Sequence, residues 1–206
     1  MVKRIFKILL KLGLLILIVG AVYLGFRNYM ILKDVHQYDD EIATAAKKYD
    51  VDDQTDLISA IIFTETKGRH EDLMQSSESR YGEAGQISSE ADSIDAGVAF
   101  LAEALKAADE AGCDESTAIQ AYNFGLDYID YVAKNGGKNT KKIAESYSRD
   151  VLSPQLGNDQ QSKYRYWGLH SLLYNGGYLY HNGGNLFYSE IVQWNQWKIE
   201  MTKFLF

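Results

Sequence analysis

The first part of the chain is one long apolar segment, and its pattern predicts a membrane-spanning helix. Residues 12–26 contain no charged side chain, and extending the segment back to residue 8 gives 19 residues interrupted only by Lys11. A helix of that length rises about 28 Å, close to the thickness of the hydrocarbon core of a bilayer. Basic residues precede the segment, which predicts a cytoplasmic N-terminus and an extracellular remainder.

A cleaved signal peptide is the alternative interpretation of this segment. The sequence Val-Gly-Ala at residues 19–21 is a passable cleavage site, and cleavage would release a secreted protein. The apolar segment is longer than the usual core of a signal peptide, so we favour an uncleaved, single-pass anchor in the cell membrane. We therefore divide the chain into a cytoplasmic stub with its anchor, residues 1–32, and an extracellular domain, residues 33–206.

Beyond the anchor, apolar residues recur at helical spacing, and no long alternating strand pattern occurs. The expected helices cover residues 34–49, 52–67, 93–111, 115–124, 128–134, 140–152 and 188–204. Asn139 is the predicted N-cap of the sixth of these helices, and Pro154 is expected after its end. Two Asn-Gly-Gly turn sequences predict a short hairpin around residues 178–180. The fold class is therefore mainly α, with one transmembrane helix in front of a helical domain.

The helix predicted over residues 52–67 places one glutamate among its apolar residues. The apolar side chains form a stripe with a 3.6-residue period: Leu57, Ile58, Ile61 and Ile62. Glu65 follows Ile61 by four residues and Ile58 by seven, so it continues the stripe that faces the core. Gly68 is the predicted C-cap. Burial and the negative end of the helix dipole both disfavour the charged form, so we expect a raised pKa for Glu65.

A glutamate that keeps its proton near neutral pH can protonate the leaving-group oxygen of a glycosidic bond. Glu65 is therefore a candidate catalytic acid for cleavage of sugar chains. The alternative is structural, because ion pairs also perturb carboxylates: Glu65 borders the core and pairs with Lys67 or Arg69. Spacing alone leaves both interpretations open.

Three short motifs carry a resemblance to a known family. They are Glu-Thr-Lys-Gly at residues 65–68, Asp-Leu-Met-Gln-Ser-Ser-Glu-Ser at 72–79 and Ala-Tyr-Asn-Phe-Gly at 121–125. Their order and spacing resemble the lysozyme-like domain of Gram-positive cell-wall muramidases, including the pneumococcal vaccine antigen A group and the muramidase half of bifunctional wall hydrolases of conjugative elements. More distantly, they are similar to soluble lytic transglycosylases and goose-type lysozymes. The resemblance covers residues 34–197 and implies a helical lysozyme-like domain with a cleft.

The resemblance also implies roles for individual residues. Glu65 would be the general acid and base. Six further residues would line the saccharide cleft or contact sugar: Gln75, Ser76, Ser77, Tyr122, Asn123 and Tyr188. Of these, Tyr122 and Asn123 would also orient the acid, and Tyr188 would begin the final helix. The serine-rich loop over residues 76–89 is expected to form one wall of the cleft.

Two positions depart from the relatives' patterns. The goose-type pattern has an aspartate where this chain has Ser77, and the soluble transglycosylases usually have serine where this chain has Thr66. The identity of a second catalytic carboxylate is therefore open. Asp72 is the first candidate, and Glu78 is the second.

The implied function is cleavage of the β-1,4 bond between N-acetylmuramic acid and N-acetylglucosamine in peptidoglycan. One alternative is a lytic transglycosylase, which gives anhydro-muramyl products and needs no second carboxylate. Another, of a different class, is a non-catalytic module that binds the cell wall or serves assembly, because a fold does not determine a function. The expected partners are the glycan strands and, through the N-terminal helix, the membrane.

Charge and the remaining side chains argue against other classes. Residues 1–32 carry five basic and no acidic groups, so the other 174 residues carry 16 basic and 28 acidic groups, a formal charge of −12. Nucleic-acid binding requires a basic face, and we expect none. The four histidines lack the spacing of a zinc site, and we expect no metal or cofactor. The single Cys113 excludes an intramolecular disulfide.

The last quarter of the chain is rich in aromatic residues and holds all three tryptophans: Trp167, Trp194 and Trp197. Exposed aromatic rings can stack on the faces of sugars. We instead expect these tryptophans to pack the final helix onto the domain. The tyrosines at 174, 178 and 180 fit either interpretation equally well.

Overall fold

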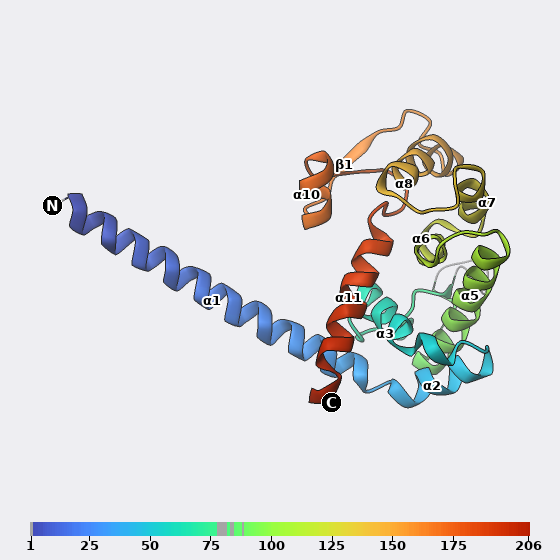
Figure 1. Cartoon of the computed structure of the whole chain (residues 1–206), viewed down its shortest axis with the longest axis horizontal. Coiled ribbons are helices and arrows are strands. Elements are labelled where there is room, and N and C mark those ends of the chain that lie inside the picture. Colours follow the sequence, from blue (N-terminus) through green and yellow to red (C-terminus); the bar gives the residue numbers. More distant parts are fainter. Residues whose placement is uncertain (1, 78–81, 83–84, 88) are drawn as a thin grey trace.

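The computed structural model of the chain describes residues 2–77, 82, 85–87 and 89–206. Helix α1 (Val2–His36) projects from a helical domain as one straight rod (Figure 1). Its N-terminal part is exposed and is long and apolar enough to cross a membrane. Its last two turns belong to the domain, because Ile31, Leu32 and Val35 are buried there. The helix therefore passes without a break through the boundary predicted at residue 32.

The prediction of one helix over residues 34–49 is wrong. The chain turns at residues 37–38, where the Tyr38 amide donates to the Val35 carbonyl oxygen, and α2 (Asp39–Lys48) starts anew. Three acidic residues fill the first turn of α2 and two lysines fill its last turn. This arrangement of charge matches the dipole of a separate helix.

Helix α3 (Thr55–Glu65) lies at the centre of the domain, after one 3₁₀ turn, η1 (Asp52–Gln54). The predicted apolar stripe is confirmed, since Leu57, Ile58, Ile61 and Ile62 are fully buried. Helix α11 (Tyr188–Thr202) packs along α3, and η3 (Lys203–Leu205) follows it (Figure 1). Residues far apart in the sequence thus meet around the C-terminal end of α3.

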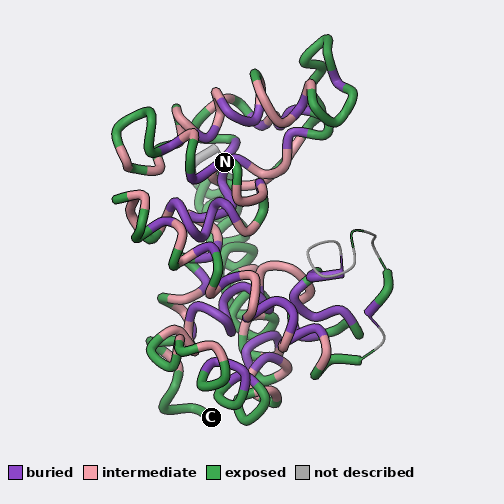
Figure 2. Tube along the Cα trace, turned by 90° about the vertical axis from the view of Figure 1, so that its right-hand side faces the viewer, coloured by how far each residue is buried: buried purple, intermediate pink, exposed green. Residues whose placement is uncertain are grey.

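Three helices form the other side of the domain: α5 (Glu90–Glu110), α6 (Glu115–Phe124) and α7 (Asp127–Lys134). The Ser89 and Asp114 side chains cap α5 and α6 by accepting backbone N–H bonds. The bounds of α6 are those the sequence predicts. Buried residues gather in two clusters, one around α3 and one around α6 and α7, and Figure 2 marks the buried residues in purple.

The segment predicted as one helix up to residue 152 consists of three pieces: α8 (Lys141–Tyr147), the π-helical η2 (Ser148–Leu152) and α9 (Ser153–Gln155). Pro154 lies inside α9, so its predicted position after the helix is wrong. The N-cap is Thr140 and not Asn139. The Asn139 side chain instead bonds the Tyr128 hydroxyl and the Ser189 hydroxyl.

The strand predicted at residues 178–180 exists, but it does not pair with an adjacent strand through a short turn, as a simple hairpin would. Strand β2 (Tyr178–Tyr180) pairs antiparallel with β1 (Lys163–Arg165), with Tyr164 opposite Leu179. Helix α10 (Leu169–Asn175) fills the connection and ends at Gly176, which has a left-handed conformation. The first Asn-Gly-Gly sequence is therefore a helix end, because a glycine readily adopts positive φ there.

The expected packing of the tryptophans into the domain is wrong. The side chains of Trp167, Trp194 and Trp197 are 72%, 54% and 48% exposed. The tyrosines of the same region differ in exposure: Tyr180 is buried, whereas Tyr174 is exposed.

Candidate active site

Two adjoining pockets form one cleft between the end of α3 and helix α6. Both are lined by Gln75, Tyr122 and Asn123. The first pocket also contains Glu65, His70, Asp72, Ser77, Gly85 and Ile87. The second contains Phe100, Phe124, Gly125, Leu152, Leu156 and Gly184. The predicted loop wall is thus present in its described residues, while Glu78 lies outside the described residues.

Glu65 is the last residue of α3, and its carboxyl group faces the first pocket. Burial raises the pKa of Glu65, and the nearby negative charge of Asp72 raises it further. A hydrogen bond from Tyr188 and the charge of Lys67 act in the opposite direction without cancelling the increase. The group therefore keeps its proton at a pH where an exposed glutamate is ionised.

The predicted structural alternative, in which Glu65 forms an ion pair with Lys67 or Arg69, does not hold. Arg69 pairs with Asp34 at the end of α1. The direct partner of Glu65 is the Tyr188 hydroxyl, which donates to Oε1 at 2.5 Å. Tyr188 begins α11, as predicted, but it is buried beside the acid and is not among the cleft-lining residues.

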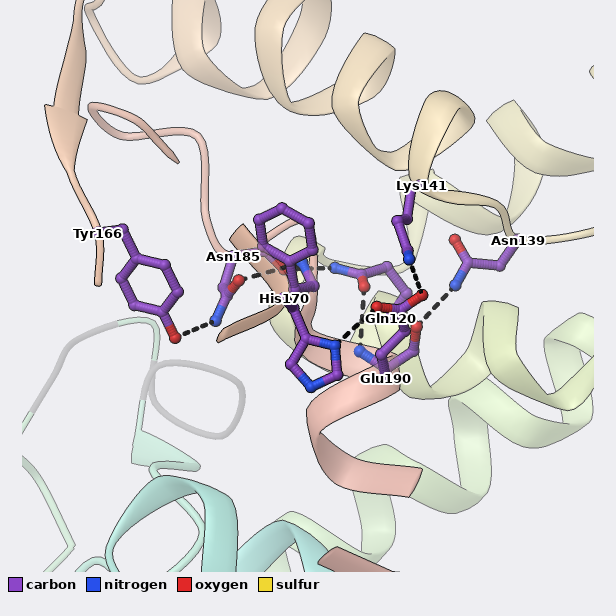
Figure 3. Close-up of polar contacts among 9 residues, drawn as sticks. Gln120, Asn139, Lys141, Tyr166, His170, Asn185 and Glu190 are labelled. Atoms are coloured by element: carbon purple, nitrogen blue, oxygen red, sulfur yellow. Dashed lines mark hydrogen bonds and ion pairs between the residues drawn. The ribbon is translucent and has the colours of Figure 1, made fainter. Parts of the chain in front are cut away.

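A network of polar side chains fixes the start of α11 and with it Tyr188 (Figure 3). The side chain of Gln120 on α6 is buried and bridges the turn before α11. Its Nε2 donates to the Asn185 carbonyl oxygen at 2.9 Å, and its Oε1 accepts from the Ser189 amide at 3.2 Å. Because these two bonds flank Tyr188 in the sequence, they hold its backbone in one position.

Further bonds in Figure 3 extend this network to the neighbouring elements. The Asn139 amide nitrogen donates to the Ser189 hydroxyl at 2.8 Å. Glu190 forms ion pairs with Lys141 and, when its imidazole is protonated, with His170 of α10, each at 3.0 Å. Three separate segments therefore hold the first turn of α11. Nothing in the sequence pattern predicts this network, since its members are up to 69 residues apart.

Asp72, the candidate second carboxylate, is buried and saturated with hydrogen bonds. Its Oδ1 accepts from the Ser76 amide and the Ser93 hydroxyl, and its Oδ2 accepts from the Ser77 amide and hydroxyl. Burial acts to raise the pKa of Asp72, but the bonds from Ser77, Ser93 and the two amides outweigh it, and the pKa is lowered. The side chain thus fixes the loop after α3.

The Leu-Met-Gln-Ser-Ser motif places only part of its side chains in the cleft. Gln75 is exposed there, with positive φ, and its Nε2 donates to the Asp72 carbonyl oxygen. Ser77 lines the cleft, but its hydroxyl group donates to Asp72 Oδ2. Ser76 is not a cleft-lining residue: it is 1% exposed, and its hydroxyl donates to the Ser93 carbonyl oxygen. The expected sugar contact by the Ser76 side chain therefore finds no support.

Tyr122 and Asn123 line the cleft from α6, but neither bonds Glu65 directly. The Tyr122 hydroxyl donates to the Met74 carbonyl oxygen at 3.0 Å, and its ring stacks parallel to that of Tyr188. Asn123 is exposed, and its Oδ1 accepts from the Asn185 amide at 2.7 Å. Tyr188 thus contacts the Glu65 carboxyl group directly, whereas Tyr122 contacts Tyr188 through the stacked ring.

Several residues of the site have no counterpart in the sequence-based prediction. Ser93 supports both Asp72 and the Met74 amide from α5. His70 is exposed and lines the cleft, and its Nδ1 accepts from the Asp72 amide. A Cβ at Gly97 would lie 2.6 Å from the Met74 sulfur, so glycine is required for the close approach of α5. Ser89 caps α5, whose first residue is Glu90, and this N-cap was the available signal that Ser93 lies in the first turns of a helix near the loop.

Thr66 stands where the soluble transglycosylases usually have serine, and its hydroxyl group forms a hydrogen bond that a serine hydroxyl could also form. Its hydroxyl donates to the Leu73 carbonyl oxygen at 2.8 Å and so ties the end of α3 to the cleft loop. Among the described residues, no group of three or more His, Cys, Asp or Glu side chains has the arrangement of a metal site.

Comparison with known proteins agrees with this arrangement. The family model described as lysozyme-like matches residues 32–196. The pneumococcal vaccine antigen A homolog of Streptococcus pyogenes is 43% identical over 194 residues, which cover 94% of this chain and 96% of the relative. Pneumococcal vaccine antigen A of Streptococcus pneumoniae is 39% identical over 201 residues, covering 97% of this chain and 96% of that protein.

Two further matches cover part of a longer protein. The bifunctional muramidase/DL-endopeptidase CwlT of Bacillus subtilis is 43% identical over 104 residues, 50% of this chain and 31% of CwlT. A crystal structure of a protein from Staphylococcus aureus, similar to lipoproteins of the NLP/P60 family, has a TM-score of 0.72 and 32% identity, covering 80% of this chain and 52% of that one. The chain described here therefore belongs to the lysozyme-like family, in the group of pneumococcal vaccine antigen A.

Proposed function

We propose that this chain is a glycosidase that cleaves the β-1,4 bond between N-acetylmuramic acid and N-acetylglucosamine in peptidoglycan. The lysozyme-like family and the muramidase relative support a peptidoglycan-acting enzyme. The observation that carries the specific assignment is Glu65: a half-buried carboxyl group in a cleft, with a raised pKa and, among the described residues, one hydrogen-bond donor, the Tyr188 hydroxyl.

Glu65 donates its proton to the glycosidic oxygen as the bond to the leaving sugar breaks. Tyr188 holds Oε1 of Glu65, so the other oxygen carries the proton toward the cleft. The resulting carboxylate then accepts a proton from the group that attacks the sugar carbon. Gln75 and Asn123 are exposed amides on the two sides of the cleft, suited to bond sugar hydroxyl and acetamido groups.

Asp72 favours a second candidate reaction. Its oxygens are occupied by hydroxyl and amide donors, which makes it a poor nucleophile or base. A lytic transglycosylase needs only one carboxylate, because the muramyl 6-hydroxyl attacks in place of water and Glu65 deprotonates it. The product then carries a 1,6-anhydro ring instead of a reducing end.

Mass spectrometry of digested peptidoglycan distinguishes the two reactions. Hydrolysis adds one water for each bond cleaved, whereas transglycosylation adds none. Muramyl fragments with a reducing end support the muramidase, and anhydro fragments support the transglycosylase. Intact glycan after prolonged incubation would contradict both.

A non-catalytic wall-binding module is the alternative of a different class. It is tested with the detergent-solubilised full chain in gels that contain purified wall. Clearing in the gel supports the enzyme. Binding to wall fragments without clearing would support the binding module.

We also propose that α1 anchors the protein in the cell membrane, with the N-terminus in the cytoplasm and the catalytic domain outside. The length and composition of α1 and the basic residues before it support this topology. The chain should then resist salt washing of membranes, and its domain should be digested by protease added outside wall-stripped cells. A soluble protein that begins near Val22 would indicate signal-peptide cleavage instead.

A further inference from the structure

The end of α1 leaves very little distance between a membrane and the domain. The apolar segment of α1 ends at Phe26, and Ile31 is already buried in the domain core. The five helical steps from Phe26 to Ile31 rise about 7.5 Å in a continuous helix. The headgroup layer on each side of the hydrocarbon core is about 5–8 Å thick. If α1 spans the bilayer, the adjoining surface of the domain therefore lies at the level of the headgroups.

All three tryptophans lie outside the two core clusters and outside the described lining of the cleft. Trp194 and Trp197 stack on each other on α11, with ring centroids 4.8 Å apart. Trp167 lies just before α10, under the guanidinium group of Arg165. Large exposed rings that serve neither the core nor the cleft indicate contact with another surface.

The spacing of residues on α11 shows where the stacked pair points. Glu190, Trp194, Trp197 and Met201 recur at i, i+4, i+7 and i+11 and so form one stripe, opposite the face that packs on α3. Helix α10 contacts the start of this stripe, through the bond between His170 and Glu190. Helix α1 contacts α11 near the other end of the stripe, where Lys198 Nζ donates to Asn28 Oδ1 at 3.4 Å.

Helix α10 adds apolar side chains to the same side of the molecule. Leu169 and Leu173 are 68% and 80% exposed, although exposure of a leucine side chain to water is unfavourable in free energy. Figure 1 shows α10 on the side of the domain from which α1 projects, above the line of α1. Helix α10 thus lies on the side of the domain from which α1 projects (Figure 1), and α11 contacts α1 on that side through Lys198.

We propose that a juxtamembrane face, made of Trp167, Leu169, Leu173, Trp194, Trp197 and Met201, rests in the headgroup layer of the bilayer that α1 spans. Tryptophan favours this layer, because its ring is apolar and its N–H finds polar partners there. The face holds the domain at a fixed tilt against the membrane instead of leaving it free to swing about α1.

The charges around the face fit lipid headgroups. The domain as a whole is acidic, but Arg27 and Lys198 lie together where α1 meets α11. Within the described part of the chain, neither has a carboxylate partner at ion-pair distance. Burial lowers the pKa of Lys198 to about 8, and the charge of Arg27 contributes. A lipid phosphate beside the pair would relieve this repulsion.

Quenching of tryptophan fluorescence by brominated lipid tests the proposal directly, because every tryptophan of the chain belongs to the face. The full chain is reconstituted into phosphatidylcholine vesicles whose acyl chains carry bromine close to the headgroup. Unbrominated vesicles are the reference, and resistance to carbonate extraction verifies insertion of α1. We expect the chain to lose most of its emission in the brominated vesicles. Because no other protein is present, only lipid can cause this loss.

Two exposed-site variants separate the parts of the face. In Trp167→Phe, the remaining emission comes only from Trp194 and Trp197 on α11. In the double variant Trp194→Phe with Trp197→Phe, it comes only from Trp167. Both variants should be quenched. Equal emission in brominated and unbrominated vesicles overturns the proposal, and so does quenching of only one variant or failure of α1 to insert. None of these outcomes depends on catalytic activity, so they leave the proposed reaction to its own test.

Discussion

The end of α3 and the loop that follows it each bring a carboxyl group to the same cleft, and the two groups have opposite properties. Glu65 is half-buried, its pKa is raised, and within the described part of the chain its one hydrogen-bond donor is the Tyr188 hydroxyl. Asp72 is also buried, at 5% exposed, yet four donors from Ser76, Ser77 and Ser93 surround it, and its pKa is lowered. Burial alone therefore does not decide the protonation state.

Among the described residues, the carboxyl group with fewer hydrogen-bond donors is the one whose pKa is raised. Transfer of a carboxylate from water favours its neutral form unless hydrogen bonds to the charged form replace the lost hydration. At Asp72 the replacement is complete, and the charge stabilises a loop. At Glu65 it is incomplete, and the proton remains available. The predictions below test this division of roles.

The largest expected effect is on activity at Glu65. Glu65→Gln keeps the shape of the side chain and accepts the Tyr188 bond but cannot donate the proton. Cleavage of purified peptidoglycan should fall at least the ~10²–10⁴-fold typical of general acid catalysis. Wall binding should persist. Retention of more than about a tenth of the activity would show that another group is the acid.

The next effect is on stability at Asp72. Asp72→Asn replaces an acceptor of four bonds by a group that must also donate, so the free energy of unfolding should fall by about 1.5–3 kcal/mol, the size of a hydrogen bond to a charged group. Urea denaturation followed by circular dichroism measures this change. Asp109→Asn, at an exposed position, is the matched control and should change little.

The activity of the same variant tests whether Asp72 also takes part in catalysis. If Asp72 only supports the loop, Asp72→Asn should keep substantial activity at temperatures where it is folded. A fully stable variant without activity would instead make Asp72 a catalytic carboxylate. The parallel Glu78→Gln variant tests the other candidate, and we expect it to be the less damaging of the two.

Tyr188→Phe tests how the acid is tuned. The Tyr188 bond lowers the pKa of Glu65, so its loss should raise that pKa further. The upper limb of the kcat/KM profile, which follows deprotonation of Glu65, should therefore move to higher pH. Loss of orientation should also lower kcat about tenfold, or ~1.4 kcal/mol. Tyr174→Phe, which removes a surface bond to Glu145, is the control and should leave the limb in place.

The smallest effect is the pH dependence of stability. For Glu65 the folded pKa is raised, so the free energy of unfolding falls as pH rises above the ordinary value of ~4.3. Glu65→Gln should therefore be slightly more stable than the parent at neutral pH and equal to it well below pH ~4. Asp72 has a lowered folded pKa, so its contribution is complete above ~3.9 and is lost as pH falls through the folded value. Thermal unfolding at several pH values should show these opposite slopes.

The sequence predicts the site best where local pattern determines structure. The stripe from Leu57 to Ile62 places Glu65 toward the core through helical spacing alone, and the caps at Asp114 and Gly125 define α6. The resemblance adds the order of the motifs. These features depend on residues within a few turns of one another, which a sequence pattern contains.

The parts that failed depend on contacts between distant segments. The role of Asp72 requires Ser93, 21 residues away on another helix, and the orientation of Glu65 requires Tyr188, 123 residues away. The exposure of the three tryptophans contradicts the usual place of large apolar residues, and no local pattern announces it. Long-range packing decides each of these features.

Infrared difference spectroscopy of the carboxyl stretch reports directly whether Glu65, and not Asp72, carries a proton. Spectra of the wild type, Glu65→Gln and Asp72→Asn are compared at a pH about one unit above the ordinary glutamate pKa of ~4.3. We predict a protonated-carboxyl band in the wild type and in Asp72→Asn that is absent from Glu65→Gln. A band that persists in Glu65→Gln but disappears in Asp72→Asn would reverse the two roles and contradict the account.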